Sequence, residues 1–427
     1  MERPLTQHIY PDRQPFDLKE YEQNGGYSPL KKAIRDHTPQ EIQKMVQDSN
    51  LKGRGGAGFN TGLKWSFVPM DDHAIHPKYL IANADEMEPG TFKDRLLLEG
   101  NPHQLIEGML IAAYAIQADI SYIFLRWAYK KAAALIRKCL DELYHAGYLG
   151  KNVLGSGWSL EMHLHTGVGR YMCGEETALL NALEGKRAMP RSKPPFPQVS
   201  GLFGKPTVVN NVETFCCLPH IVNNGADWFK SISLSEDGGT KIYGVSGKVK
   251  RPGAWELPIG ITMRELLEEY AGGMLNGYEF KGVLPGGAST DFLTKDHLDI
   301  KLDFKSVTAA GSRLGTGTMI VMDDATCPVG FVHNLQHFFA QESCGWCTPC
   351  REGLPWIEKI LLSIENGNGR MEDLDILNEH THLLGPGHTF CALAPGAMEP
   401  LQSALKYFRE DFERHIHDHA CPWKETA

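Results

Sequence analysis

The chain has 427 residues, of which 42% are hydrophobic and 22% are charged, as in ordinary soluble globular proteins. A chain of this length is expected to fold as two or three domains. The net charge of −9 argues against a nucleic-acid-binding protein, which usually carries a basic excess or patch. Acidic and amide residues interrupt the most apolar long window, residues 105–125, and the N-terminus lacks a signal pattern. We therefore predict a cytoplasmic protein or one on a cytoplasm-facing surface.

The first clear element is a helix that begins near residue 39. Thr38 is a suitable N-cap, Pro39 suits the first helical position, and Glu41 completes a capping box. The sequence LKGRGGAGFNTGLKW, residues 51–65, follows directly and contains G-x-G-x-x-G.

Strands and helices then alternate. The pattern predicts a strand at 79–82, helix 102–116, strand 121–126, helix 128–147, strand 159–167 and helix 174–186. This alternation indicates an α/β domain with a largely parallel sheet. Residues 187–214 are rich in Pro and Gly and are predicted to form a long, functional surface loop.

The pattern of predicted elements changes after about residue 240. A hairpin over 241–260, a short helix over 262–273 and a strand over 280–290 indicate a small α+β module of β-grasp type. The remainder is predicted to be helical and to form a small bundle, with segments at 331–343, 353–367, 371–384 and 395–417.

Three cysteines, Cys344, Cys347 and Cys350, are spaced three residues apart in SCGWCTPCREG, and Cys391 follows forty residues later. Zinc sites usually pair CxxC with a second CxxC or with histidines. The overlapping CxxCxxC pattern with one distant cysteine is instead typical of a [4Fe–4S] cluster. A zinc staple and unrelated buried thiols are the alternatives. A cluster would imply electron transfer one electron at a time.

The glycine-rich segment matches the dinucleotide-binding pattern, but its surroundings do not. That pattern requires a preceding strand and a following helix, whereas here a capped helix precedes it and no clean helical stripe follows. A flexible linker would carry few bulky groups, yet Phe59, Lys64, Trp65 and Phe67 are interleaved with the glycines. Glycines that admit an anion, beside cations and flat aromatic rings, favour a nucleotide site.

Six blocks taken together resemble a known family. They are GRGGAGFNTGLKW, NADEMEPGTFKDR, GRYMCGEETALLNALEG, PRSKPPFP, GKPTVVNNVET and ESCGWCTPCREGLPW. In this order and spacing they resemble the flavin-bearing F subunit (51 kDa subunit) of respiratory complex I, an NADH-quinone oxidoreductase. The resemblance covers nearly the whole chain, from about residue 25 to 414.

The resemblance implies a three-domain fold. A Rossmann-like domain that binds FMN and NADH is expected over 1–235, a ubiquitin-like SLBB domain of β-grasp type over 236–330, and a C-terminal four-helix bundle with the [4Fe–4S] cluster over 331–427. It also implies an enzyme activity: NADH gives a hydride to FMN, and electrons pass singly to the cluster and onward to quinone. The implied partners are a thioredoxin-like [2Fe–2S] E-type subunit and the large iron–sulfur G-type subunit, with the complex attached to the inner face of the cell membrane.

The resemblance also implies site residues, by number in this sequence. The glycine loop (Gly53, Arg54, Gly55, Gly56, Ala57 and Gly58) with Lys64 is expected near phosphate. FMN is expected to contact Asn83, Asp85, Tyr171, Gly174, Glu175, Asn210 and Asn211, with Glu86 and Val209 beside them. Phe59, Phe67 and Phe196 resemble an aromatic clamp for the adenine of NADH, with Lys193 near the same ligand. The cluster ligands are Cys344, Cys347, Cys350 and Cys391.

Two carboxylates are singled out as functional. Glu176 is expected to accept hydrogen bonds from the NADH ribose hydroxyls and to repel the 2′-phosphate of NADPH; the alternative, an acid favoured by the helix dipole at a helix start, applies equally to Glu175. Glu88 is expected near the nicotinamide and flavin. No proton-transfer residue is assigned, because hydride transfer is cofactor chemistry.

Departures from the family pattern are few. Trp127 and Ala128 replace a small residue and an acid, and Asn60 stands where Pro is frequent. The tail DHACPWKETA matches no family feature, and we expect Cys421 to be an exposed thiol. Two alternatives remain: the diaphorase subunit of an NAD-linked hydrogenase or formate dehydrogenase, and an electron-transfer scaffold without NADH activity.

Overall fold

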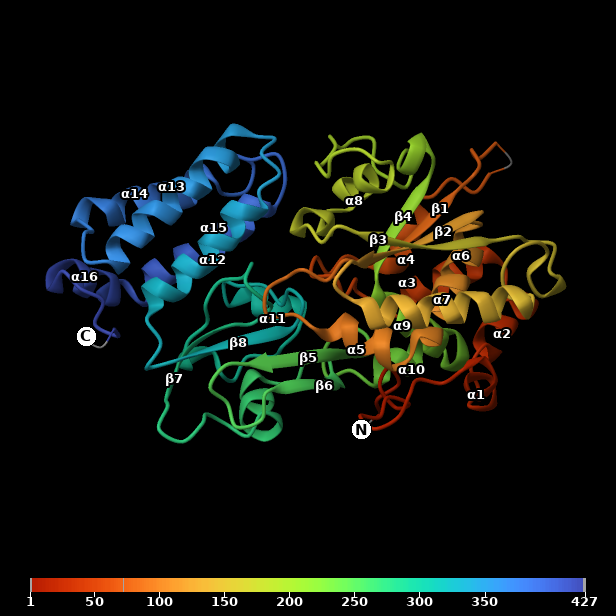
Figure 1. Cartoon of the computed structure of the whole chain (residues 1–427). Helices are drawn as coiled ribbons and strands as arrows, with labels where there is room; N and C mark the ends of the chain where they lie inside the picture. Colours follow the sequence, from red (N-terminus) through yellow and green to blue (C-terminus); the bar gives the residue numbers. More distant parts are fainter. Residues whose placement is uncertain (1, 72, 425–427) are drawn as a thin grey trace. The chain divides into compact units, whose positions relative to one another are not determined.

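The computed structural model describes residues 2–71 and 73–424 (Figure 1). They form two compact units. Unit 1 contains the chain up to Met87, together with Phe92–Ile242 and Glu256–Gly260, and unit 2 contains Glu88–Thr91, Tyr243–Trp255 and the chain from Ile261 onward. No helix among the described residues is long and apolar enough to cross a membrane.

Unit 1 is built on a four-stranded parallel sheet with the order β3-β2-β1-β4. The strands are β1 (Tyr79–Ala84), β2 (Ile120–Arg126), β3 (Glu161–Gly167) and β4 (Thr207–Asn211). Its helices are α1 (Leu18–Gln23), α2 (Ser28–Asp36), α3 (Pro39–Asp48), α4 (Thr61–Ser66), α5 (Lys93–Gly100), α6 (Pro102–Ile116), α7 (Lys130–His145), α8 (Glu176–Leu183), α9 (Val212–Asn224) and α10 (Ala226–Ser231). The predicted parallel α/β architecture is confirmed.

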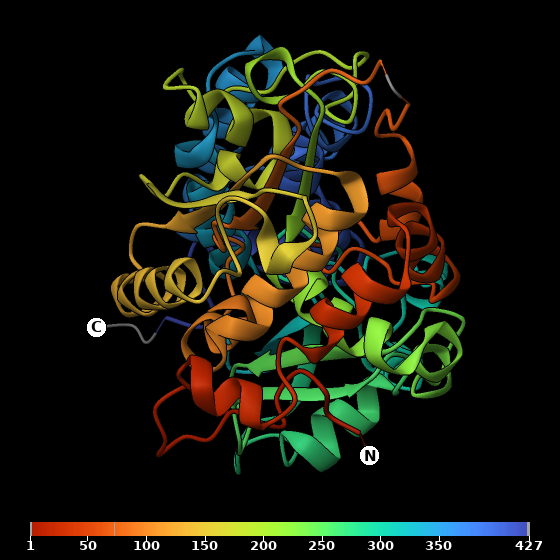
Figure 2. The ribbon, with the colours of Figure 1, turned by 90° about the vertical axis from the view of Figure 1, so that its right-hand side faces the viewer.

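Helices cover both faces of this sheet because alternate residues of a strand point to opposite sides. Tyr79, Ile81 and Val209 pack with Leu179 and Leu180 of α8 on one face. The other face is covered by α6 and α9, which pack on each other and on β1. The N-terminal helices, red in Figure 2, include α2, which packs against α6 and α9.

The predicted start of α3 is confirmed. Thr38 is the N-cap, its hydroxyl accepts from the Glu41 backbone N–H at 3.3 Å, and the Glu41 carboxylate accepts from the Thr38 N–H at 2.7 Å. α4 was not expected. It packs so closely on α3 that a Cβ on Gly62 would lie 2.2 Å from the Gln47 backbone nitrogen, so only glycine fits there.

The interpretation of residues 187–214 as one long surface loop is wrong in its last part. Residues 207–211 form β4, which pairs in parallel with β1 and is almost wholly buried. The strand is only five residues long and two of those are Asn, so its β-branched start (TVV) lies too close to the preceding prolines and glycines to stand out. Residues 187–206 do form an irregular connection that includes the short 3₁₀ turn Leu202–Gly204.

The N-terminal residues of unit 1 are fastened to a distant carboxylate. Glu256 accepts hydrogen bonds from the backbone N–H groups of Leu5 at 3.0 Å and Thr6 at 2.8 Å. The hydroxyl of Thr240 donates to the same carboxylate at 2.6 Å. Glu256 is 2% exposed, so these donors replace the water that burial removes.

Unit 2 contains a second sheet, of order β6-β5-β8-β7. Its strands are β5 (Thr240–Ser246), β6 (Gly253–Pro258), β7 (Phe280–Leu284) and β8 (Thr318–Asp323), and the boundary between the units passes through β5 and β6. β8 pairs in parallel with β5 and antiparallel with β7. The predicted short helix is a π-helical turn, Glu265–Tyr270, followed by α11 (Phe304–Ala309). β8 was not predicted.

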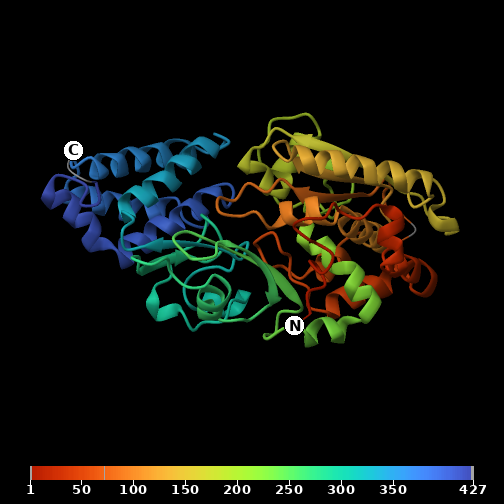
Figure 3. The ribbon, with the colours of Figure 1, turned by 60° about the horizontal axis from the view of Figure 1, so that its bottom comes forward.

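Five helices complete unit 2, blue in Figure 3; the first four pack on one another as a bundle and the short last one contacts all four. They are α12 (Pro328–Glu342), α13 (Thr348–Glu365), α14 (Met371–Leu383), α15 (Leu393–Tyr407) and α16 (Arg409–Asp418). The first three predicted segments are confirmed, but the fourth is divided into α15 and α16 by a break at Phe408.

Candidate functional site: a nucleotide crevice and a cysteine cluster

The order of the strands in unit 1 creates a switch point at the carboxyl ends of β1 and β4, the region that we call the crevice. The chain proceeds from β1 outward to β2 and β3 and then returns to place β4 on the other side of β1. Ligands of open α/β sheets bind beyond the carboxyl ends of strands where the direction of winding reverses. Asn83 and Asn211 are register partners at the ends of β1 and β4, so both lie at this point.

The glycine-rich loop and α4 lie over the end of β4. A Cβ on Gly55 would meet the Asn211 side chain at 3.3 Å. The indole N–H of Trp65 donates to Asn210 Oδ1 at 2.9 Å, and Lys64 Nζ donates to the Val209 carbonyl at 2.8 Å. Trp65 is fully buried. It therefore fixes an amide and does not offer a ring for stacking.

Two glycines of the loop have backbone angles that L side chains rarely adopt. Gly56 has φ +122° and Gly58 has φ +66°. The base of the loop is closed by the Gly53 N–H, which donates to the Phe59 carbonyl at 2.8 Å. This segment is therefore a shaped turn and not a linker.

Arg54 supports the loop from below. Its backbone N–H donates to Thr214 Oγ1 at 2.9 Å, and its guanidinium donates to the carbonyls of Gly238 and Thr240 at 2.8 and 3.0 Å. The side chain is fully buried. We expected the positive charge of Arg54 to lie near the phosphate of the ligand. In the structure its guanidinium instead faces the protein interior.

Charged side chains beneath the loop form what we call the floor: Arg54, Lys93, Asp94, Glu213 and Lys241. Lys93 Nζ lies 2.6 Å from Asp94 and 2.8 Å from Glu213, and Glu213 lies 3.3 Å from Lys241. Each of these five residues is at most 3% exposed. Burial opposes the ionisation of Glu213, but Lys241 and the other two cations lower its pKa to about 2. Burial lowers the pKa of Lys241 to about 8.

The floor holds Asn211 in one orientation. Its Nδ2 group donates to Asp94 at 2.6 Å, while its Oδ1 accepts from Lys93 at 3.1 Å and from the Glu213 N–H at 2.9 Å. Asn211 is thus the N-cap of α9, which is the local role expected of an Asn in a turn. Sequence reasoning singled out neither Lys93 nor Asp94 as a site residue, although both lie within the NADEMEPGTFKDR block.

The end of β1 is joined to the turn before α8. Asn83 Nδ2 donates to the carbonyls of Cys173 and Gly174 at 3.3 Å, and Asn83 Oδ1 accepts from the Asp85 N–H at 3.1 Å. Tyr171 and Gly174 belong to the 3₁₀ turn Tyr171–Gly174, and a Cβ on Gly174 would meet no atom within 4 Å. Five of the predicted FMN residues therefore gather at the strand ends: Asn83, Asp85, Gly174, Asn210 and Asn211.

Glu86 has a different surrounding. Its carboxylate accepts from the N–H groups of Asp94 and Arg95 at 2.8 and 3.1 Å and from the Tyr129 hydroxyl at 2.8 Å. Burial and the neighbouring Asp94 raise its pKa to about 7. These contacts hold the first turn of α5, so Glu86 fixes the helix that carries Lys93 and Asp94 of the floor.

The two adjacent glutamates at the start of α8 have separate tasks. Glu175 is the N-cap, and one of its oxygens accepts from the N–H groups of Thr177 and Ala178 at 2.8 and 2.9 Å. Glu176 makes no such cap; it lies 2.7 Å from Lys64 and 3.0 Å from Lys193. Burial acts to raise the pKa of Glu176, but the two lysines outweigh it and hold the pKa below its ordinary value. The helix-start explanation therefore accounts for Glu175 and not for Glu176.

We call the wall a group of side chains from α4 and its flanks, the start of α8 and the connection 187–206: Phe59, Lys64, Phe67, Glu176, Lys193 and Phe196. Phe59, Phe67 and Phe196 are 49%, 52% and 56% exposed, and the first two rings lie 6.5 Å apart. The connection that carries Lys193 and Phe196 is fixed to α8, because Arg191 lies 2.7 Å from Glu184. Large half-exposed aromatic rings beside paired charges are suited to bind a flat, charged ligand.

Glu88 belongs to unit 2. Its carboxylate accepts from the Ser289 N–H at 2.7 Å. Gly287 has φ +103°, and a Cβ there would lie 2.6 Å from the Glu88 side chain. The role of Glu88 near nicotinamide stays a prediction.

The predicted cluster cysteines lie at the start of α13 and before α15. Cys344 and Cys347 are half-buried in the loop, Cys350 is in the first turn of α13, and Cys391 precedes α15. Burial, and then the nearby Cys347, Cys391 and Cys344, raise the pKa of Cys350 to about 12. The ring of Trp346 lies 5.8 Å from that of Phe390, which joins the two cysteine-bearing segments.

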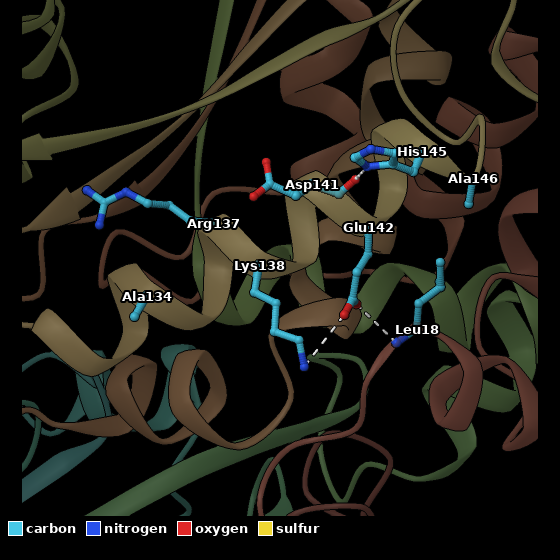
Figure 4. Close-up of a pocket in the computed structure, with 8 residues that line it drawn as sticks. All are labelled: Leu18, Ala134, Arg137, Lys138, Asp141, Glu142, His145 and Ala146. Carbon is cyan, nitrogen blue, oxygen red and sulfur yellow. Dashed lines mark hydrogen bonds and ion pairs between the residues drawn. The ribbon is translucent and has the colours of Figure 1, made fainter.

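Both sites fit the predicted groups. Three of the four cysteines lie at the N-terminus of α13, an 18-residue helix whose positive end favours anionic ligands, and Cys391 lies near Cys350; their spacing in the sequence is that expected for a [4Fe–4S] cluster. The crevice offers a glycine turn for a phosphate and fixed amides for a polar ring edge. A hollow on the outer side of α7 offers neither (Figure 4). Leu18, Lys138 and Glu142 line it, and Glu142 accepts from the Leu18 N–H at 3.2 Å.

Comparison with known proteins agrees with these two sites. Residues 46–220 match the Nuo51 FMN-binding domain, 242–292 the SLBB domain, and 330–415 the NADH-ubiquinone oxidoreductase-F iron-sulfur binding region. The F subunits of NADH-quinone oxidoreductase in Salmonella typhimurium and in Escherichia coli are each 57% identical over 97% of this chain and 93% of their own length. The corresponding protein of Streptomyces coelicolor is 47% identical over 99% of this chain and 94% of its own.

The chain belongs to the family of NADH-quinone oxidoreductase F subunits. The predicted FMN, NADH and [4Fe–4S] cluster are confirmed as its cofactors and substrate, and so is its function: it is an NADH dehydrogenase subunit that passes electrons to an iron–sulfur cluster. The predicted fold, an FMN-binding domain, an SLBB domain and an iron–sulfur region, is confirmed as well.

Solved structures resemble this chain over most of its length. Two crystal structures of an NAD⁺-reducing [NiFe]-hydrogenase, in the H₂-reduced and the air-oxidized state, match with TM-scores of 0.81 and 0.82 at 36% and 35% identity. The chain covers 63% and 65% of those hydrogenase chains. The curated relatives, by contrast, are covered almost entirely.

Proposed function

We propose that the crevice at the ends of β1 and β4 holds FMN, and that the wall holds NADH against it. Bound FMN supplies hydride acceptance from NADH and release of electrons one at a time. The chain's residues orient the two ligands. Gly55, Gly56 and Gly58 admit phosphate to the backbone, and Asn83, Asn210 and Asn211 present fixed amides at the strand ends.

The observation that carries this proposal is the pairing of Glu176 with two lysines of the wall. Lys64 and Lys193 hold the carboxylate ionised, and its side chain is 20% exposed, so it can accept hydrogen bonds from ribose hydroxyls and repels a 2′-phosphate. If Glu176 is removed, Lys64 loses its carboxylate and Lys193 keeps only Glu175, 3.1 Å away, so the two lysines can attract a phosphate. Selection for NADH thus depends on one negative charge placed between two positive ones.

Substitution of Glu176 by Ala tests this proposal. We expect kcat/KM for NADPH to rise about tenfold or more relative to NADH, because repulsion is lost and two ammonium groups are left without the carboxylate. The double variant Glu176→Ala, Lys193→Ala should lose most of that gain. Substitution of the helix cap, Glu175→Asp, should leave the NADH/NADPH ratio unchanged. An unchanged ratio in Glu176→Ala would remove Glu176 from the specificity mechanism.

We further propose that this chain works with a thioredoxin-like [2Fe–2S] E-type subunit and the large iron–sulfur G-type subunit, on the cytoplasmic side of the cell membrane. Support comes from the full-length relatives, all subunits of an NADH-quinone oxidoreductase. The three-domain division at residues 235 and 330 belongs to the same proposal. Purification from cells should yield the chain with iron–sulfur partners and no hydrogenase subunit.

A diaphorase subunit of a hydrogenase is the second candidate, favoured by the two structural neighbours. Both candidates reduce ferricyanide with NADH, so that activity cannot separate them. The proteins that copurify with the chain can. A nickel-containing partner would support the second candidate and overturn the first.

A further inference from the structure

Unit 2 contains a second group of metal-ligating side chains that shares no residue with the cysteine cluster. Cys327, Glu365, His415 and Cys421 each direct one ligand atom to a common point, and these four atoms lie within 4.8 Å of one another. Glu365, His415 and Cys421 are buried. Cys421, expected to be an exposed thiol, is only 6% exposed. The expectation failed because the tail folds back onto the bundle.

The distances suit one small ion. Cys327 Sγ lies 3.2 Å from His415 Nε2 and 3.2 Å from Glu365 Oε2, and the latter two atoms lie 3.4 Å apart. In a tetrahedral zinc site, bonds of about 2.0–2.3 Å separate neighbouring ligand atoms by roughly 3.3–3.8 Å. The side chains are therefore already spaced as ligands.

The orientation of His415 is that of a metal ligand. Its Nδ1 lies 2.6 Å from the Asp411 carbonyl, which can only accept, so Nδ1 carries a proton and Nε2 is the ring nitrogen that faces Cys327 and Glu365. Metal-bound histidines usually donate their other ring N–H to a carbonyl or carboxylate in this way. Trp423 stacks on the His415 ring at 5.7 Å and fixes its plane.

The charges around Glu365 also favour a cation. This carboxylate is the last residue of α13, where the negative end of the helix dipole disfavours an anion. Two thiolates and a carboxylate on a divalent ion leave one negative charge. Lys424 Nζ, 3.2 Å from the second oxygen of Glu365, balances it.

Capping alone does not explain the group. Cys327 is the N-cap of α12, and its sulfur accepts from the Gly330 N–H at 3.2 Å. Ser, Thr, Asp and Asn are the preferred caps, so cysteine is an unusual choice. A cap also needs no second thiol, imidazole and carboxylate brought to it from three other segments.

We propose that Cys327, Glu365, His415 and Cys421 bind one structural Zn²⁺ ion. Two thiolates, an imidazole and a carboxylate form a closed set of four donors that zinc accepts and that leaves no open position for substrate. Binding would release one proton from each thiol. The ion would fasten the tail after α16 to the first turn of α12 and the last turn of α13.

Elemental analysis of the holoenzyme, after dialysis against EDTA, tests this proposal. We expect one zinc per chain beside the iron of the cluster. Zinc-edge X-ray absorption sees only zinc and should show two sulfur neighbours at about 2.3 Å and two nitrogen or oxygen neighbours at about 2.0 Å. A shell of four sulfurs with reduced iron would mean zinc in the cluster site and would overturn the proposal, as would absence of zinc.

Matched variants separate a zinc ligand from a helix cap. Cys327→Ser keeps a good cap but removes a thiolate, and Cys421→Ser removes the tail ligand; both should lose at least tenfold in zinc retained against EDTA. His417→Ala, an exposed histidine of the same helix, should keep zinc. Full zinc in Cys421→Ser, or a Cys327–Cys421 disulfide found by mass spectrometry of the unreduced protein, would contradict the site. None of these readouts depends on NADH oxidation.

Discussion

The wall and the floor of the nucleotide crevice differ in how far their side chains are exposed to solvent. The wall is half-exposed: Phe59, Phe67 and Phe196 each leave about half of their surface in water. The floor is closed: Lys93 and Glu213 are buried and satisfy each other at 2.8 Å. Substitution of an exposed side chain changes the free energy of unfolding little, whereas a buried charge left without its partner lowers it strongly. The floor should therefore govern stability and retention of flavin, and the wall should govern affinity and selection of NADH.

The largest effect should come from Glu213→Gln. The change leaves Lys241 buried without its carboxylate and weakens the hold on Lys93, so we expect a loss of about 3–5 kcal/mol in the free energy of unfolding. Urea denaturation followed by circular dichroism measures it. Glu268→Gln, which breaks an exposed ion pair with Arg264, should lower the free energy of unfolding far less than Glu213→Gln does. Equal losses in the free energy of unfolding for Glu213→Gln and Glu268→Gln would show that the floor contributes no more to stability than a surface ion pair.

Acid should destabilise unit 1 through the same residue. The pKa of Glu213 is about 2 in the folded chain and 4.5 ordinarily, so its contribution is complete above pH 4.5 and is lost as pH falls toward 2. The unfolded chain binds the proton first, which is why stability falls with pH. This contribution amounts to at most about 3 kcal/mol in the free energy of unfolding. Denaturation at several pH values should show this slope in the unmodified chain, and Glu213→Gln should lack it.

A smaller effect is expected from Asp94→Asn. Asn211 loses the carboxylate that fixes its Nδ2 group at 2.6 Å, so the amide is free to turn. We expect the flavin content per chain to fall severalfold while the iron content is unchanged, because the cluster cysteines belong to unit 2. Flavin fluorescence after heat release, compared with iron analysis, gives both values. Full flavin content would show that the floor does not position the ligand amides.

The smallest effect should come from the wall. Phe59→Ala and Phe67→Ala should raise KM for NADH about threefold to tenfold, the value of one lost ring contact. Because both rings are half-exposed, the unfolding midpoint should stay within a degree or two of the unmodified chain. Steady-state kinetics and a thermal melt of each variant measure the two quantities. If the unfolding midpoint fell as far as that of Glu213→Gln, these rings would belong to the core and not to the wall.

Much of the fold follows from local pattern. The capping box at Thr38 and Glu41 and the apolar helix at Pro102–Ile116 are encoded within a few residues; the start of the first helix and both bounds of the second were predicted correctly. β4 and β8 were missed. β4 becomes a strand because β1 pairs with it, and β8 because β5 and β7 lie on either side of it. Such pairing partners are distant in sequence, so local pattern cannot supply them.

The site divides in the same way. Cys344, Cys347 and Cys350 lie within seven residues of one another, so spacing alone indicates their chemistry. Cys327 and Cys421 come from segments nearly a hundred residues apart, and nothing in the sequence connects them. Arg54 and Trp65 were predicted for the ligand from their residue types, but folding turned both side chains inward. Residue type shows what a group can bind, and only the fold shows which way it faces.

The attachment of Leu5 and Thr6 to Glu256 has a consequence for biosynthesis. These partners are separated by 251 and 250 positions, so a ribosome needs roughly 10–50 s to synthesise the carboxylate after the amides have emerged. During that interval the parallel sheet from β1 to β4 can form, because its last strand ends at Asn211. Leu5 can accept from Gln104 within this interval, whereas the two amide hydrogen bonds to Glu256 can form only after the sheet strands have been synthesised.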